Sequence, residues 1–362
     1  MIQKKQLSIL SFLFLFLSCK QNNYDWKVYN SDVTNLKSID EKFNKILNID
    51  NSVYLFGSRD ESTNMTDMEY VVYKSVNFGK NWELILEGNG DIVNAFYANQ
   101  DIYLVKENYK ENSFKGFKTT LLKFNIKTGI IESVHQFKKE SSIIDGILDD
   151  YESGSLIISN SFSSTDNSIF KTSDNFNSCD SIYIGKSIKK NYFFKNKIYL
   201  LTYELILKNY KVQEQNKLYI IDKDDNRDSL YIESNINDFV VDIDGILLLG
   251  KKEEDITLNY FGKKEDVNIT SIIRAGNLEP QKIYKYKSFI AVLLSSTNEH
   301  ALGGFGGSEY HLFLSFDNGK VFKEEELPIK DYVGQILFYK DEKIIIYSGS
   351  GRISVCKLKK TI

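Results

Sequence analysis

Short apolar runs that alternate with polar residues recur along almost the whole chain. The runs are rich in Val, Ile, Tyr and Phe, which favour strands, and clusters of Asn, Asp, Gly and Lys separate them. Representative runs are residues 52–56, 70–74, 197–201 and 343–347. This pattern predicts many short β-strands joined by polar turns.

Helical periodicity is weak by comparison. Residues 34–47 form the one stretch with some helical character. The high content of aromatic residues, 24 Phe and 23 Tyr, fits strands, because aromatic side chains pack well on a pleated surface. We therefore predict an all-β protein.

A turn motif with the pattern Ser-x-Asp/Asn-x-Gly-x-x-aromatic occurs twice. Its residues are Ser75, Asn77, Gly79 and Trp82 in one copy, and Ser315, Asp317, Gly319 and Phe322 in the other. Each copy lies between two apolar runs, and five intervals of 48 residues separate the copies. Further polar turns begin close to the expected places, at residues 125, 172 and 222. The spacing predicts a chain built from repeated units.

The turn motif resembles the Asp-box, or bacterial neuraminidase repeat, of sialidase-type β-propellers. In that family the hydroxyl and the Asp bond the backbone of their own turn, Gly supplies a positive φ, and the aromatic ring lies under the turn. Asn77 departs from the pattern, which has Asp at this position. The resemblance implies a propeller in which these turns join the third and fourth strands of a blade. It implies no activity, because the turns lie away from the face that carries active sites in the family.

The length of the repeated unit predicts the number of blades. Residues 19–362 comprise 344 residues, which divide into seven units of similar length. Six units with recognisable strands cover residues 43–90, 91–140, 141–187, 188–234, 235–275 and 276–328. The last segment offers three strands, and residues 25–30 offer a fourth. We predict one propeller domain over residues 25–362, with seven four-stranded blades closed by the N-terminal strand, which removes an exposed sheet edge. Six or eight blades also fit, since the unit at 235–275 is short.

The first eighteen residues predict a secretory signal peptide. Lys4 and Lys5 precede an apolar run over residues 7–17, which is too short to span a bilayer stably. Residues 16–19, Phe-Leu-Ser-Cys, resemble the lipobox of bacterial lipoproteins, although that family prefers Leu at the first position. The resemblance implies cleavage before Cys19, lipid attachment to Cys19 and a lipidated tether over residues 19–24. A plain signal peptide with a chance cysteine is the alternative.

The residue after the predicted lipidation site bears on localisation. It is Lys20, whereas Asp at this position would favour retention in the inner membrane of enteric bacteria. We therefore expect a cell-envelope protein, anchored through its lipid in the outer membrane. Both the periplasmic and the surface-facing orientation remain open.

Composition and charge exclude several classes of protein. Hydrophobic residues make up 42 % and charged residues 26 %, which excludes a disordered chain, a collagen-like fibre and a polytopic membrane protein. A formal net charge of -3 and the lack of a basic tail argue against nucleic acid as a partner. No metal-binding motif occurs, so we expect no metal and no cofactor. Cys179 and Cys356 fall in different units and are expected to be free thiols.

The connections between the second and third strands of the predicted units are long. They cover residues 57–69, 106–118, 159–167, 203–216 and 295–310. Loops on a rigid scaffold often carry binding residues, so the face with these loops is the candidate functional face. The most unusual loop holds several glycines and presents His300, Phe305 and Tyr310 as candidate binding residues. A hairpin tip without a binding role is the alternative.

The arginines give a test for sialidase chemistry. Sialidases bind the carboxylate of their substrate with three arginines and use a Tyr/Glu pair and an Asp in catalysis. This chain has four arginines and lacks the Phe/Tyr-Arg-Ile-Pro motif of that family. Arg59, Arg274 and Arg352 fall in loops of the candidate face and could form an anion site, since Arg suits bidentate anion contacts.

The sequence therefore favours a lipid-anchored envelope protein that binds a protein partner through the loop-rich face of its propeller. An envelope complex or an immunity-type role fits this interpretation. We assign no catalytic residue, and an enzyme is less favoured than a binding protein. The alternative is a glycan-binding or glycan-cleaving protein of the sialidase-like superfamily.

Overall fold

A computed structural model describes most of the chain after the predicted tether. The described residues are 26–29, 41–60, 68–77, 81–98, 100–109, 117–136, 142–148, 154–159, 167–172, 180–185, 187–195, 197–208, 210–222, 226–232, 235–252, 255–262, 273–274, 277–297, 308–325, 327, 333–339, 343–348 and 353–357. The predicted signal peptide and Cys19 lie outside these residues, as do the motif residue Gly79 and the candidates His300, Phe305 and Arg352.

The described strands form seven four-stranded antiparallel sheets, which we call blades 1 to 7. Blade 1 contains β2 (Glu41–Ile49), β3 (Ser52–Asp60), β4 (Met68–Ser75) and β5 (Glu83–Asn89). Blade 2 contains β6 (Asp91–Ala98), β7 (Asp101–Tyr109), β8 (Phe117–Asn125) and β9 (Ile131–Gln136). Blade 3 contains β10 (Ser142–Leu148), β11 (Gly154–Ser159), β12 (Asn167–Thr172) and β13 (Asp180–Tyr183).

Blades 4 to 7 continue in chain order. Blade 4 contains β14 (Ser187–Phe194), β15 (Lys197–Lys208), β16 (Lys211–Asp222) and β17 (Arg227–Ile232), and blade 5 contains β18 (Asn235–Val241), β19 (Gly245–Lys252), β20 (Asp255–Gly262) and β21 (Ile273–Arg274). Blade 6 contains β22 (Leu278–Tyr286), β23 (Phe289–Thr297), β24 (Ser308–Ser315) and β25 (Lys323–Glu325). Blade 7 contains β26 (Val333–Tyr339), β27 (Lys343–Ser348), β28 (Ile353–Lys357) and β1 (Trp26–Tyr29).

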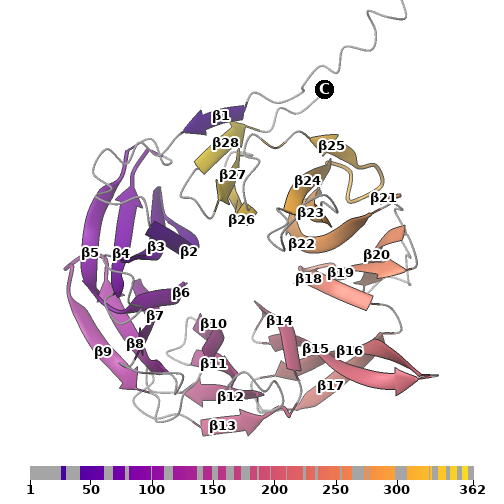
Figure 1. The fold of residues 1–362 in the computed structure, drawn as a ribbon, viewed down its shortest axis with the longest axis horizontal. Helices are drawn as coiled ribbons and strands as arrows, with labels where there is room; N and C mark the ends of the chain where they lie inside the picture. Colours follow the sequence, from indigo (N-terminus) through magenta and orange to yellow (C-terminus); the bar gives the residue numbers. More distant parts are fainter. Residues whose placement is uncertain are drawn as a thin grey trace, which may run out of the picture.

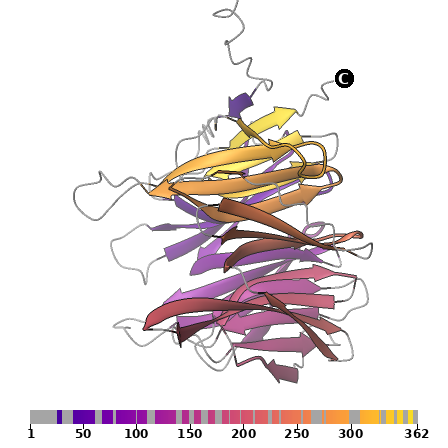
Figure 2. The same cartoon turned by 90° about the vertical axis from the view of Figure 1, so that its right-hand side faces the viewer.

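The blades are arranged around a central axis, so the prediction of an all-β propeller is confirmed (Figure 1). The first strand of each blade lies nearest the axis, and the strands run across the thickness of the ring in the side view of Figure 2. The ring closes where β1 pairs antiparallel with β28, with Trp26 opposite Cys356 and Tyr29 opposite Ile353. The outer strand of the last blade therefore comes from the N-terminal part of the chain, which is the closing strand that the sequence predicts.

Every innermost strand contains a register shift of one residue near its beginning. The extra residues are Asn44, Val93, Ile144, Lys189, Asn237, Gln281 and Gly334. A β-bulge of this kind bends a strand and re-aims the side chains beside it. Because the bulge recurs at the same place in all seven blades, it repeats one local geometry around the axis.

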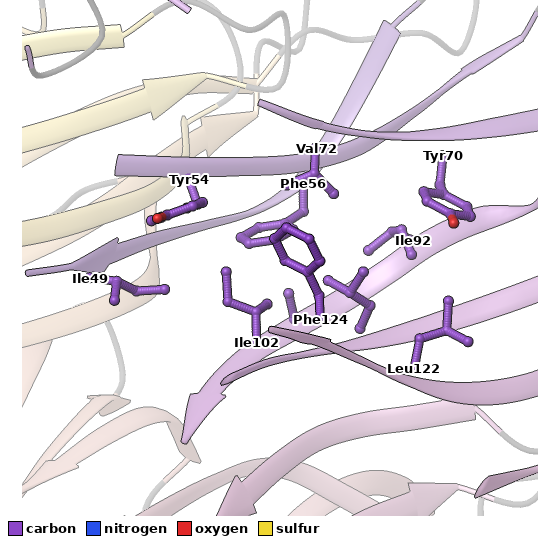
Figure 3. Packing of buried hydrophobic residues seen from close by; sticks show 11 residues of the cluster. Ile49, Tyr54, Phe56, Tyr70, Val72, Ile92, Ile102, Leu122 and Phe124 are labelled. Atoms are coloured by element: carbon purple, nitrogen blue, oxygen red, sulfur yellow. The ribbon is translucent and has the colours of Figure 1, made fainter. Parts of the chain in front are cut away.

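The hydrophobic core lies between neighbouring blades. Between blades 1 and 2, Phe56 and Val72 from one sheet pack against Ile92, Ile102 and others from the next, as Figure 3 shows. Phe56, Val72, Ile92 and Ile102 are fully buried. Burial of each such side chain contributes about 1.5–3 kcal/mol. These contacts hold each blade against its neighbour.

The weak helical signal over residues 34–47 was misleading in its second half. Residues 41–49 form β2, and the bulge at Asn44 explains the signal. The extra residue places the buried Phe43 and Ile46 three positions apart, which imitates helical spacing. Within the described residues, no helix has the length and apolar character needed to cross a membrane.

Candidate functional site

The topology gives the ring two different faces. One face, here called the loop face, carries the connections between second and third strands and the connections between blades. The other, the turn face, carries the turns between first and second strands and between third and fourth strands. In an antiparallel sheet these connections must fall at opposite ends of the strands. The two copies of the turn motif follow the third strands β4 and β24, and therefore lie on the turn face.

The second copy of the motif bonds its own backbone. The Ser315 hydroxyl donates to Asp317 Oδ1 at 2.7 Å and accepts from Gly319 N at 2.8 Å. Asp317 Oδ1 also accepts from Lys320 N and Val321 N, both at 3.0 Å. Gly319 has φ of 85°, a left-handed conformation that suits glycine. Phe322 packs against the hydrophobic core beneath the turn.

The first copy uses the same device with a neutral side chain. Ser75 donates to Asn77 Oδ1 at 3.0 Å, and Asn81 N donates to the same oxygen at 2.9 Å. Trp82 is only 9 % exposed. The turn after β8 is built in a similar way, since Asn125 Oδ1 accepts from Thr128 N at 2.9 Å. All of these polar side chains are used to fix local turns.

Arg59 lies on strand β3 and not in a loop, so this part of the sequence prediction is wrong. Arg59 is only 7 % exposed, and a nitrogen of its guanidinium lies 2.6 Å from Glu69 Oε2 and 2.8 Å from Glu87 Oε2. Desolvation lowers the pKa of Arg59, but the hydrogen bonds and charges of Glu69 and then Glu87 outweigh it and raise the pKa. The two carboxylates balance the charge of Arg59, which disfavours an anion site at this position.

Of the other candidate residues, the structure describes Arg274 and Tyr310. Arg274 was also predicted in a loop, but it ends the short strand β21, where its backbone pairs with Asp255. Tyr310 lies on β24 opposite Ser295, half-buried rather than at a loop tip. With Arg352, His300 and Phe305 outside the described residues, convergence of the three arginines stays a prediction.

The connection between the second and third strands of blade 4 differs from the loop predicted over residues 203–216. β15 and β16 continue as a two-stranded hairpin whose last pair is Lys208 opposite Lys211. β14 pairs with β15 only as far as Tyr203, and β17 pairs with β16 only as far as Asn216. We call residues 204–215 the arm, because among the described strands they pair only with each other (lower right of Figure 1).

The arm exposes large apolar side chains. Leu205 is 63 % exposed, Leu207 is 73 % exposed and Tyr210, in its terminal turn, is 99 % exposed. On the turn face, exposed apolar residues such as Ile243 and Val321 belong to turns of different blades. The arm gathers its apolar residues in one segment.

A polar groove lies on the loop face at the base of the arm. Its volume is about 260 Å³, and its lining residues are Lys189, Glu214, Asn235, Asn237, Lys251 and Glu279. These residues come from blades 4, 5 and 6. Lys189 Nζ contacts Glu214 Oε1 at 2.7 Å, and Lys251 forms an ion pair with Glu279. The groove therefore presents amides and paired charges.

The arm and the groove share one surface. Leu205 lies directly opposite Glu214, and Leu207 lies two residues further along the same strand. Side chains at such positions point to the same side of a sheet. On that side, Asn216 accepts a hydrogen bond from Ile236 N of the next blade at 2.7 Å. The two leucines therefore extend the wall of the groove above blade 5.

Sequence reasoning placed the candidate face among these connections but missed the arm and the groove. The apolar residues 205–207, which lie within the predicted loop, are the signal that could have revealed the arm. The groove has no local signal, because three blades contribute to it. No group of three or more metal-ligating side chains occurs within the described part of the chain.

Comparisons with known proteins agree on the fold. No family model and no curated protein matches the chain. The solved structure of YCF48 bound to D1 peptide is 10 % identical, with a TM-score of 0.62 and coverage of 95 % of this chain and 98 % of that chain. The β-propeller domain of the Trilobed protease from Pyrococcus furiosus is 10 % identical, with a TM-score of 0.60 and coverage of 87 % and 95 %.

A third structure, YCF48 from Cyanidioschyzon merolae, is also 10 % identical, with a TM-score of 0.57 and coverage of 92 % of this chain and 98 % of that chain. At this level of identity, the similarity shows a common β-propeller fold and nothing about function.

Proposed function

We propose that this chain is a binding protein without catalytic activity, and that it holds an extended segment of a protein partner between the arm and the groove. The observation that carries the proposal is the continuous surface from the exposed Leu205 and Leu207 to the polar groove. Extended polypeptide presents alternating apolar side chains and a row of backbone polar groups. Leu205 and Leu207 can contact the apolar side chains of such a segment, and the amides of Asn235 and Asn237 can hydrogen-bond its backbone.

The pairing of the arm supports the same proposal. Beyond Tyr203 and Asn216, no described strand pairs with the outer edges of β15 and β16. Such edges accept an additional strand from another chain, and a hairpin with two strands is only marginally stable alone. A bound segment would therefore also stabilise the arm. The D1 peptide bound to YCF48 is a propeller-fold precedent for a partner of this kind.

The proposal includes the predicted anchor. A seven-bladed propeller of the Asp-box type, tethered through lipid on Cys19 to the outer membrane, would carry its loop face to a partner in the cell envelope. The motif residues at 75–82 and 315–322, with the hydrogen bonds of their turns, support the Asp-box relationship. An envelope complex and an immunity-type partner both fit, whereas the balanced charge of Arg59 weakens the glycan alternative.

Site-specific photo-crosslinking in cells tests the proposal. A photoreactive phenylalanine derivative replaces Leu207 in the full-length chain, and the matched control carries it at Ile243, which is 68 % exposed on the turn face. We expect a discrete protein adduct from position 207 that is absent from position 243. A charge reversal in the groove, Lys251→Glu, should reduce the yield of this adduct about tenfold.

Equal adducts from both positions, or an adduct unaffected by K251E, would show that the arm and the groove are not the binding surface. A glycan adduct at position 207 in place of a protein would replace the proposal with the glycan alternative.

A further inference from the structure

The closing strand fixes the end of the ring at which the chain enters the fold. β28 is the third strand of blade 7, so it runs from the loop face to the turn face. β1 pairs antiparallel with β28, and its first residue, Trp26, lies opposite Cys356, one residue before the end of β28. The chain therefore enters β1 at the turn face.

The predicted tether between the lipid and the ring is short. Residues 19–25 link the predicted lipidation site to Trp26, and seven residues span at most about 25 Å. A tether that leads to the loop face would first have to pass along blade 7, where the six residues of β27 cover about 20 Å. The arm extends a further five residues of β15 beyond Tyr203, about 17 Å. The tether is too short to reach a membrane beyond the arm, whereas a membrane at the turn face is within its reach.

Three turns on the outer part of the turn face share one composition. They join the third and fourth strands of blades 1, 2 and 6, and blades 1 and 6 flank the blade that contains β1 (Figure 1). Each exposes a branched aliphatic side chain, at 70 %, 63 % and 59 % of its surface: Val76, Ile130 and Val321. Each turn also contains one lysine, at positions 80, 127 and 320. We call these three turns the rim.

The charge of the rim differs from that of the corresponding turn across the ring. In blade 4 this turn is Lys-Asp-Asp-Asn over residues 223–226, with two carboxylates and no apolar residue. The rim has three lysines and one carboxylate, Asp317, which accepts hydrogen bonds from N–H groups of its own turn. Lys127 Nζ donates to the neutral Gln100 Oε1 at 2.6 Å, a contact that leaves its charge unbalanced.

Aliphatic side chains beside lysines match the chemistry of a bilayer surface. The apolar groups enter the boundary between headgroups and acyl chains, and the ammonium groups stay at the level of the lipid phosphates. Anionic lipids attract lysines close to the surface. The rim therefore combines both kinds of contact on the side of the ring where the tether arrives.

We propose that the rim rests on an anionic lipid bilayer, with Val76, Ile130 and Val321 in the interfacial region and the lysines of the rim on lipid phosphates. This inference rests on the lipid anchor of the proposed function. The acyl chains hold the protein at the membrane, and the rim fixes its orientation. The loop face, with the arm and the groove, then points away from the membrane and toward the partner.

Fluorescence quenching by a spin-labelled lipid tests this orientation. The full-length chain, purified from cell membranes, is reconstituted into vesicles of phosphatidylethanolamine and phosphatidylglycerol that contain the spin-labelled lipid. A fluorescent amino acid replaces Val321, and the matched control carries it at Tyr210, which is exposed at the tip of the arm. We expect about threefold stronger quenching at position 321 than at position 210. Equal quenching at both positions, or stronger quenching at position 210, would overturn the proposal.

Charge reversal tests the lysines of the rim. One variant combines Lys127→Glu with Lys320→Glu. The control combines Lys118→Glu with Lys252→Glu, which changes the net charge equally at exposed positions near the loop-face ends of β8 and β19. We expect the first variant to lose about half of the quenching at position 321 and the control to keep it. Full quenching in both variants would overturn the assignment of the lysines to lipid phosphates.

The outcomes separate this inference from the partner-binding proposal. A wild-type chain that does not sediment with the vesicles would overturn the anchor and the orientation together, whereas crosslinking from position 207 would still test the partner. Quenching at position 321 without a protein adduct from position 207 would support the orientation and overturn the binding surface. A spectral shift at position 321 that depends on protein concentration in lipid-free detergent would instead assign the rim to a second copy of the chain.

Discussion

Buried or bonded polar side chains in the turn-face motif and at the loop-face ends of the strands serve different purposes. On the turn face they bond the backbone of their own turn, as Asp317 does with Lys320 N and Val321 N. On the loop face they bond the backbone of the next blade, as Asn216 does with Ile236 N and Asp238 does with Ile283 N. The bonds of Asp317 therefore stabilise one blade locally, whereas the bonds from Asn216 to Ile236 N and from Asp238 to Ile283 N hold two blades together. The difference predicts unequal costs when each kind of bond is removed.

The largest effect is expected at the loop-face end. Asp238→Ala would leave Lys190 without its carboxylate and two backbone N–H groups without their acceptor. Removal of one partner from a buried ion pair costs roughly 3–5 kcal/mol, and partial exposure of Lys190 places this case near the lower end. Urea unfolding of the two proteins measures the loss. Asp244→Ala, at an exposed turn-face position, should change stability by less than about 0.5 kcal/mol. Equal losses would erase the distinction between the faces.

A smaller and pH-dependent effect is expected on the turn face. Burial raises the pKa of Asp317, but bonds from the Ser315 hydroxyl and from the N–H groups of Val321 and Lys320 outweigh it, so the pKa is lowered. The stability that the charge contributes is therefore present above the unfolded pKa of about 3.9 and lost as the pH falls through the lower folded value. Asp317→Asn should cost about 0.5–1 kcal/mol at pH 7 and much less at pH 2–3. A constant difference between the two proteins across this range would contradict the assignment.

The smallest expected effect is a gain in folding stability from a substitution in the first copy of the motif. Asn77→Asp would give the oxygen that accepts from Ser75 and Asn81 N a negative charge. Charge-assisted hydrogen bonds are stronger than neutral ones, although exposure to water limits the gain to about 0.3–0.5 kcal/mol. Thermal unfolding at pH 7 would detect a small rise in Tm. A fall would mean that the turn around residue 77 does not accept a carboxylate as the turn around Asp317 does.

The sequence was informative wherever a feature repeats along the chain. The predicted unit at 91–140 corresponds to β6–β9 over 91–136, because strand alternation and polar turns are local signals. The bulges were missed for a related reason. One extra residue at Asn44 interrupts the alternation and gives an i, i+3 spacing that resembles a helix. An alignment of all seven inner strands would have revealed the bulge, because it recurs near the beginning of each strand.

Features that depend on contacts between strands and between blades could not be read from the sequence. Arg59 was predicted in the connection over residues 57–69, yet it continues β3 and is held by Glu69 and Glu87 from two further strands. The groove combines residues from three blades, and no local pattern marks them. Pairing across a sheet or between sheets decides these positions, and tertiary context overrides local preference there.

The pairing of β1 with β28 determines when the ring can close during folding. β1 is made before the other strands of the ring, and its partner β28 is made after them. The closing pair cannot form until β28 has been made, and every intermediate before that leaves the edges of the unfinished ring exposed. Contacts of such long sequence separation slow folding and prolong exposure to aggregation. Closure of the ring is therefore a single event that requires every strand from β1 to β28.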